Sequence, residues 1–116
     1  MEADLELNIR KVGSIPVIDL SGDLDTYTCG KLREAILNLL GNAETRLIIR
    51  MAKVNYIDSS GLGTLVGGLR RVSEQNGALA ISGASEQLRK VFSITGLNKV
   101  FSLFEDDEQA ARSLKR

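Results

Sequence analysis

The chain has 116 residues, 43% hydrophobic and 26% charged, which are ordinary proportions for one folded domain and exclude disordered, collagen-like and coiled-coil chains. Fifteen Lys and Arg residues balance fifteen Asp and Glu residues, so the zero net charge provides no general attraction for nucleic acid or an anionic membrane. Because the sequence has no His, it excludes Ser-His-Asp catalysis, Cys-His catalysis and His-ligated zinc, and with them most hydrolase mechanisms.

The sequence contains a single cysteine, Cys29, which excludes an intrachain disulfide and a four-thiolate metal site. No apolar run approaches the roughly 20 residues that a membrane span requires. We therefore expect a soluble cytoplasmic protein that forms one domain over residues 1–116, in which Cys29 is an inert, half-buried packing residue.

The chain opens with two predicted strands. Apolar and polar residues alternate from Leu5 to Ile9, the pattern of a strand with one face on a core. A turn at Gly13-Ser14 leads into a second β-rich run from Ile15 to Leu20. We expect these strands to pair as an antiparallel hairpin, with Pro16 at the strand start or facing outward because it cannot donate to a ladder.

Helical and extended patterns alternate through the rest of the chain. Apolar residues at helical spacing predict helices over residues 32–40, 62–72, 86–94 and 107–115. Short apolar runs predict strands at residues 47–49, prolonged by 54–57, at 78–82 and at 100–103. The alternation predicts an α/β fold with a mixed sheet of four to five strands and about four helices.

Sites in open α/β sheets lie beyond the carboxyl ends of strands, which directs attention to residues 21–28 and 55–63. The segment Asp58-Ser59-Ser60-Gly61-Leu62-Gly63 places hydroxyl groups at a helix N-terminus, where the helix dipole stabilises negative charge by roughly 0.3 to 1 kcal/mol. A phosphate on one of these serines would therefore be tolerated by the fold and would change the surface charge by about −1.5 to −2. The simpler interpretation is that Asp58 or Ser59 only caps the helix.

Four glycines, Gly61, Gly63, Gly67 and Gly68, lie in or beside this one predicted helix, where each interior Gly costs roughly 1 kcal/mol relative to Ala. The cost indicates a close approach by another backbone or by a partner. For Gly67 and Gly68, tight packing of the helix on the sheet is an equally physical explanation. The segment lacks the third glycine and the Lys of phosphate-binding loops, which disfavours a nucleotide-binding enzyme.

The ten residues Val54-Asn55-Tyr56-Ile57-Asp58-Ser59-Ser60-Gly61-Leu62-Gly63 closely resemble the signature of bacterial anti-sigma factor antagonists, which are single STAS domains of partner-switching pathways. The segment Gly22-Asp23-Leu24-Asp25 is similar to the second motif of that family, and Ser93-Ile94-Thr95-Gly96-Leu97 is similar to the third. The order of the predicted strands and helices also matches the family over nearly the whole chain.

The resemblance implies a phosphorylation switch. In the family, the unphosphorylated domain binds an anti-sigma factor serine kinase, which carries ATP and Mg, and thereby frees a sigma factor to activate transcription. The kinase phosphorylates the serine after the motif Asp, binding is lost, and a PP2C-type phosphatase restores it. Carried onto this sequence, the phosphoacceptor is Ser59. The resemblance implies a monomer or weak dimer that is not an enzyme, holds no cofactor or metal, and contacts neither nucleic acid nor membrane.

The two loops supply the remaining candidate partner-binding residues: Asp23, Asp25, Tyr27, Asp58, Ser60, Gly61, Leu62 and Gly63. Asp25 matches the acidic residue of the family at the partner interface, and its alternative role is to cap the helix that starts near Thr28. Ser60 is expected to be a cap or a contact. Tyr27 and Leu62 either supply apolar contact area or pack inward.

The segment Arg50-Met51-Ala52 departs from the family, which usually has an Asp or Asn near the end of the central strand. Two interpretations stay open: Arg50 attracts the phosphate of a modified Ser59, or it points away as a solvated charge. The fold prediction does not depend on which is right.

A different function shares the same predicted fold. STAS modules also serve in lipid-transport, transporter-regulatory and sensory scaffold complexes, and a shared fold does not distinguish among these roles. The intact Asp58-Ser59-Ser60-Gly61 motif and the absence of an apolar run of membrane-spanning length favour the antagonist.

Overall fold

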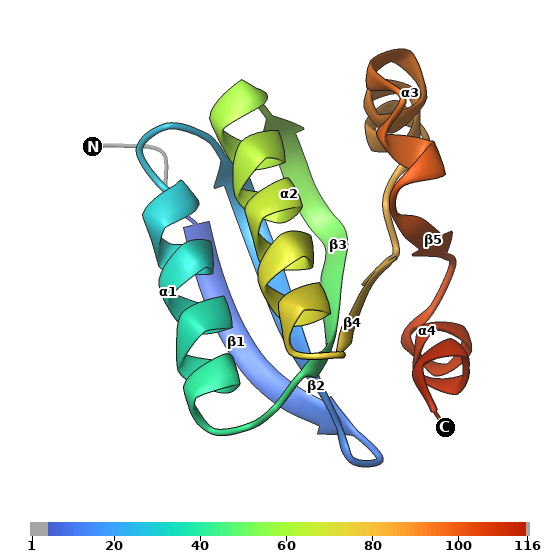
Figure 1. The fold of residues 1–116 in the computed structure, drawn as a ribbon. Coiled ribbons are helices and arrows are strands. Elements are labelled where there is room, and N and C mark those ends of the chain that lie inside the picture. The colour runs from blue at the N-terminus through green and yellow to red at the C-terminus, as the bar shows by residue number, and fades with distance from the viewer. Residues whose placement is uncertain (1–4, 116) are drawn as a thin grey trace.

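Five strands and four helices alternate along the chain in the computed structural model, which describes residues 5–115 (Figure 1). The strands are β1 (Leu5–Val12), β2 (Ile15–Leu24), β3 (Arg46–Ile57), β4 (Ala78–Ser82) and β5 (Ser102–Phe104). The helices are α1 (Cys29–Gly41), α2 (Ser59–Glu74), α3 (Glu86–Thr95) and α4 (Asp107–Leu114), with a short 3₁₀ helix, η1 (Leu97–Lys99). The predicted α/β fold class is confirmed.

The five strands form one mixed sheet in the order β1-β2-β3-β4-β5. The strands β1 and β2 are antiparallel and turn at Gly13-Ser14, where Val12 pairs with Ile15, so the predicted hairpin is confirmed. The strands β2, β3, β4 and β5 run parallel to one another. Because β2 and β3 are parallel and pair as far as Leu24 and Ile57, their carboxyl ends meet at the same edge of the sheet.

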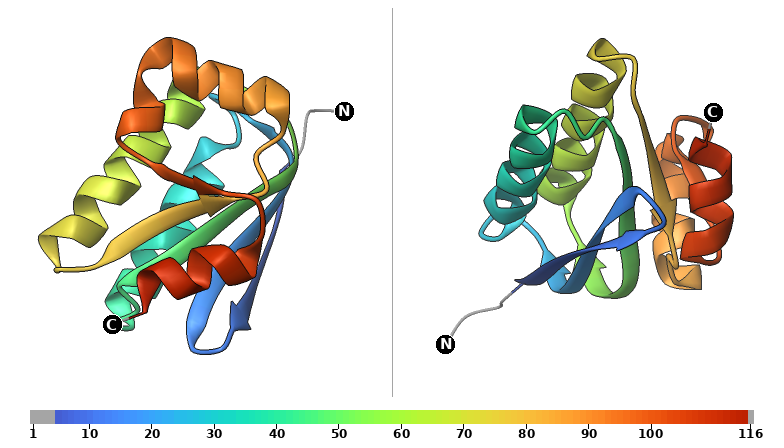
Figure 2. Two further views of the ribbon diagram at one scale, coloured as in Figure 1. Left: turned by 90° about the vertical axis from the view of Figure 1, so that its right-hand side faces the viewer. Right: turned by 90° about the horizontal axis from the view of Figure 1, so that it is seen from below.

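The sheet is covered on both faces (Figure 2). Alternate residues of β3 divide between the two faces, as the pleat of a strand requires. Ile49 and Met51 join the larger core cluster with residues of α1, α2 and α3, whereas Ile48 packs with Ala110 and Leu114 of α4. The continuous apolar run in β3 is therefore buried on both sides, as the sequence predicts for a central strand.

Several local details differ from the sequence predictions. Ile9 was expected on the core face but is 48% exposed. Cys29 is buried rather than half-buried. The last strand begins at Ser102 instead of Val100, because the amides of Val100 and Phe101 are bonded to the carbonyl of Leu97, the first residue of η1. Among residues 5–115, no helix combines the length and the apolar character needed to cross a bilayer.

Candidate functional site

The candidate site forms where the β2–α1 loop meets the start of α2, at the edge of the sheet where β2 and β3 end (Figure 1). The backbone N–H of Asp58 donates to the Leu24 carbonyl at 3.2 Å. A Cβ added at Gly61 would lie 2.5 Å from the Leu24 carbonyl oxygen, closer than any side chain can approach. Gly61 is therefore required by a backbone of the domain itself, which is one of the two explanations that the sequence left open for it.

Asp58 is the N-cap of α2, so the capping interpretation of this residue is confirmed. Its backbone is extended (φ −111°, ψ −174°), and its Oδ1 accepts from the N–H of Gly61 at 3.0 Å. Its Oδ2 accepts from the N–H of Thr26 at 3.2 Å and from the Thr26 hydroxyl at 3.3 Å. The N–H of Gly61, assisted by the bonds from Thr26, lowers the pKa of Asp58, which is therefore a carboxylate at neutral pH.

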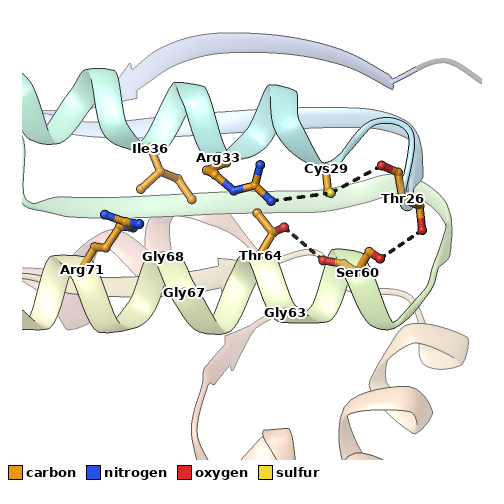
Figure 3. A pocket seen from close by; sticks show the side chains of 10 residues that line it. All are labelled: Thr26, Cys29, Arg33, Ile36, Ser60, Gly63, Thr64, Gly67, Gly68 and Arg71. Atoms are coloured by element: carbon orange, nitrogen blue, oxygen red, sulfur yellow. Dashed lines mark hydrogen bonds between the residues drawn. The ribbon is translucent and has the colours of Figure 1, made fainter.

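The two adjacent serines of the motif have different surroundings. Ser59 is the first residue of α2, its side chain is exposed, and within the described residues its hydroxyl has no hydrogen-bond partner. Ser60 is half-buried, and its Oγ lies 3.0 Å from the Oγ1 of Thr26 (Figure 3). The Ser60 carbonyl also accepts from the Thr64 hydroxyl at 3.0 Å. Of these two serines, Ser59 is therefore the one whose hydroxyl is exposed and unbonded within the described residues.

Asp25 shapes the loop before α1 rather than capping the helix. Its Oδ1 accepts from the backbone N–H of Tyr27 at 2.9 Å and from that of Thr28 at 3.1 Å. The N-cap of α1 is Thr28, whose side chain makes no capping bond to the helix and instead donates to the Asp23 carbonyl at 2.7 Å. The prediction that Asp25 caps this helix is wrong, because its carboxylate binds the N–H groups of Tyr27 and Thr28, which precede the first residue of the helix.

The candidate contact residues Tyr27 and Leu62 point in different directions. Tyr27 is 91% exposed, so the inward-packing alternative is wrong for it. Leu62 is half-buried against the larger core cluster, as the inward-packing alternative states. Gly63 is exposed, and Asp23 is half-buried in β2. We call the surface formed by residues 25–28 of the β2–α1 loop and residues 58–63 the loop face; from the predicted set it offers one large exposed aromatic side chain, Tyr27.

The sequence prediction did not name Thr26, which contributes to this face, or Tyr56, an exposed aromatic residue near the end of β3. Thr26 connects the loops through Asp58 and Ser60, and Tyr56 is 54% exposed in β3, two residues before Asp58. The parallel ends of β2 and β3 could have indicated Thr26, because a hydroxyl in one loop faces the cap of the other. Nothing in the sequence pattern around Tyr56 indicates that its side chain is exposed rather than buried in the core.

The glycines inside α2 fall into two classes. A Cβ on Gly68 would lie 2.8 Å from Ile36 Cδ1 of α1 and 3.6 Å from Leu79 Cδ1 of β4, so tight packing explains this residue. A Cβ on Gly63 or Gly67 would meet nothing within 4 Å. The packing explanation is therefore wrong for Gly67. No contact within the domain requires a glycine at this position, although glycine makes the helix less stable than alanine would.

Arg50 fits neither of its predicted roles. Its side chain lies on the face covered by α4, where its Nη1 donates to Asp107 Oδ1 at 3.3 Å. Asp107 also accepts from Arg10 Nη2 at 2.7 Å and from Ser82 Oγ at 2.6 Å. Arg50 is thus neither a phosphate ligand for Ser59 nor a solvated charge, but part of an ionic cluster that attaches α4 to the sheet.

Comparison with known proteins places this geometry in a family. A family model described as the STAS domain matches residues 6–111. The anti-sigma-B factor antagonist of Bacillus subtilis is 34% identical over 92 residues, which cover 78% of this chain and 83% of the relative. The crystal structure of an anti-sigma factor antagonist from Mycobacterium paratuberculosis is similar with a TM-score of 0.87 at 20% identity, over 97% of this chain and 96% of that chain.

The Bacillus cell fate determinant SpoIIAA, whose structure is known in the phosphorylated form, is similar with a TM-score of 0.73 at 24% identity, over 95% of this chain and 100% of that chain. At this level of identity the two structural likenesses establish a common fold. The family model and the Bacillus subtilis relative go further, because they match most of the sequence itself. The chain therefore belongs to the STAS-domain family of anti-sigma factor antagonists.

Proposed function

We propose that this protein is a phosphorylation-controlled anti-sigma factor antagonist. Its unphosphorylated form binds an anti-sigma factor serine kinase through the loop face around Ser59 and thereby releases a sigma factor. Phosphorylation of Ser59 ends that binding, and a PP2C-type phosphatase restores it. The observation that carries the proposal is the contrast between an exposed, unbonded Ser59 and a half-buried Ser60 tied to Thr26.

Phosphoryl transfer places few demands on the chain that receives the phosphate. The Ser59 Oγ attacks the γ-phosphorus of the kinase-bound ATP, the bond to ADP breaks, and the serine proton passes to a base on the kinase. The antagonist contributes a reachable hydroxyl held on a rigid helix start, with Asp58 and Gly61 fixing the backbone there. It supplies no catalytic group and no cofactor in this scheme, and is a substrate and binding partner rather than an enzyme.

The phosphate acts on the docking face and not on the fold. It would add a charge of about −1.5 to −2 at neutral pH beside the Asp58 carboxylate, which is already negative. The N-terminal end of α2 favours an anion, so the helix tolerates the modification. A kinase surface fitted to the uncharged serine then meets new charge and bulk, and binding is lost. The phosphorylated structure of SpoIIAA is consistent with a fold of this type that survives the modification.

The experiment that tests the proposal is phosphorylation by the cognate anti-sigma factor kinase with ATP and Mg, read by mass spectrometry of the intact chain. We expect one phosphate on the wild type and none on Ser59→Ala. The matched control is Ser60→Ala, which removes the neighbouring hydroxyl and should still be phosphorylated. Label on Ser59→Ala at the wild-type level would contradict Ser59 as the acceptor. Failure of the wild type to bind or be modified by the kinase would instead favour a STAS module of another assembly.

A further inference from the structure

A groove of about 340 Å³ runs between α1 and α2 and begins beside the loop face (Figure 3). The hydroxyls of Thr26 and Ser60 lie at one end, and Arg71 lies at the other. From Ser60 to Arg71 the α2 helix rises about 16 Å, at about 1.5 Å per residue. The groove is therefore long enough to receive several residues of an extended polypeptide, and one of its ends is adjacent to Ser59.

Two glycines keep this groove open without serving the packing of the domain. Gly63 and Gly67 both line it, and a Cβ at either position would meet no atom within 4 Å. Neither residue has the positive φ that favours glycine. Glycine inside a helix is less stable than alanine, so their presence is unfavourable for the isolated chain. The open space that they leave is accessible only to something from outside the domain.

The groove also carries positive charge that the described residues do not neutralise. Arg33 of α1 and Arg71 of α2 both line it and are both exposed. Among residues 5–115, neither guanidinium has a carboxylate within 4.0 Å, although other arginines of the chain do. Within the described part of the chain, the one hydrogen bond of the Arg33 guanidinium joins its Nη2 to the Cys29 sulfur at 3.9 Å. A guanidinium is a preferred partner of carboxylates, which it binds through two parallel hydrogen bonds.

We propose that this groove binds an extended acidic segment of the same kinase that docks on the Ser59 face. Its carboxylates contact Arg33 and Arg71, and its backbone lies over Gly63 and Gly67. The inference rests on the proposed function and adds the chemistry of the partner. Because the groove begins next to Ser59, a phosphate there would repel the acidic segment as well as block the serine, which couples the two contacts.

The first test fills the groove. The double variant Gly63→Ala/Gly67→Ala adds two methyl groups where the domain has room for them. We expect its affinity for the cognate kinase, measured by calorimetry, to fall about tenfold, whereas its thermal midpoint by circular dichroism rises because alanine favours the helix. A purely structural role for these glycines would give a lower midpoint. The matched control is Gly41→Ala at the end of α1, another position with open space, which should leave the affinity unchanged.

The second test removes the charge. We expect Arg33→Gln and Arg71→Gln each to weaken kinase binding about fivefold and to reduce its dependence on salt concentration. The matched control is Arg70→Gln, the adjacent arginine on α2, which lies outside the groove lining and should bind as the wild type does.

The outcomes separate this inference from the proposed function. If Ser59→Asp loses kinase binding while the glycine and arginine variants keep it, the groove inference is wrong and the proposed function stands. If the wild type does not bind the kinase, both are wrong. If the glycine variants lose binding but the arginine variants and salt have no effect, the occupant is not acidic, and the inference is overturned.

Discussion

Two carboxylates at opposite places in the domain show how the same functional group serves different purposes. Asp58, on the loop face, accepts its hydrogen bonds within residues 5–115 from uncharged groups, which include the Gly61 and Thr26 amides and the Thr26 hydroxyl. Asp107, the first residue of α4, accepts from Arg10 and Arg50 in addition to Ser82. The first arrangement orders a loop and leaves its negative charge uncompensated at the surface. The second neutralises the charge and attaches a helix to the sheet.

The comparison teaches that local ordering and fold stabilisation are separated in this molecule. The Asp58 side orders the start of α2, where Ser59 and the nearby Tyr27 are exposed. The Asp107 side chain is only 15% exposed, and its partners come from β1, β3 and β4. We therefore expect changes on the loop face to alter binding and changes at Asp107 to alter stability.

The largest effect is expected for a negative charge at Ser59, the proposed phosphoacceptor. Ser59→Asp should lower affinity for the anti-sigma factor kinase by about 100-fold, because it introduces a negative charge into the docking face. Its thermal stability should stay close to that of the wild type, since the helix N-terminus accepts an anion. Calorimetry and thermal melting measure the two quantities. Ser14→Asp, in the β1–β2 turn, is the control, and equal affinity loss in both variants would contradict a local effect.

A substitution at Gly61 tests how much the backbone contact on the loop face contributes to the stability of the domain. Gly61→Ala forces a Cβ against the Leu24 carbonyl, and we expect it to lower the free energy of unfolding by about 2 to 3 kcal/mol in urea titrations. The control is Gly63→Ala, two residues along the same helix, which should be neutral or stabilising because its Cβ has open space. Equal destabilisation of both variants would show that helix packing, rather than the loop contact, demands Gly61.

On the opposite face, Asp107→Asn should leave kinase binding unchanged and lower the free energy of unfolding by about 1 to 2 kcal/mol, because charge-assisted hydrogen bonds from Arg10 and Arg50 are lost. Urea titration and kinase calorimetry on the same preparation test both parts. Asp106→Asn, the neighbouring N-cap of α4, is the control, since Asn is an equally good cap. Loss of kinase binding in Asp107→Asn would contradict the view that the Asp107 cluster serves stability and the loop face serves binding.

The smallest expected effect is a pH dependence of the difference in unfolding free energy between the wild type and Asp107→Asn. Burial raises the pKa of Asp107, but the hydrogen bonds from Ser82 and Arg10 outweigh it, so the pKa is lower in the folded state than in the unfolded chain. Its stabilising contribution is therefore complete above the unfolded value of about 3.9 and is lost as the pH falls through the folded value. The stability gap between wild type and Asp107→Asn should shrink in acid. A gap that is the same at neutral and acidic pH would contradict this assignment.

Much of the architecture follows from local patterns in the sequence. The alternation from Leu5, the two-residue turn at Gly13-Ser14 and the cap at Asp58 each depend on residues close together in the chain, and all three appear in the structure. The exposure of Ile9 and the late start of β5 were not predicted, because each depends on which elements cover that part of the sheet.

The same division holds within the candidate site. The sequence by itself determined the element order, the presence of a cap at Asp58 or Ser59, and the position of these residues at the start of α2, because periodicity and capping are properties of neighbouring residues. Only the tertiary structure decided that Thr26 ties Ser60, that Arg50 pairs with Asp107, and that Gly63 and Gly67 face open space. These contacts join residues far apart in the chain, and their geometry exists only after β2, β3 and the helices have packed.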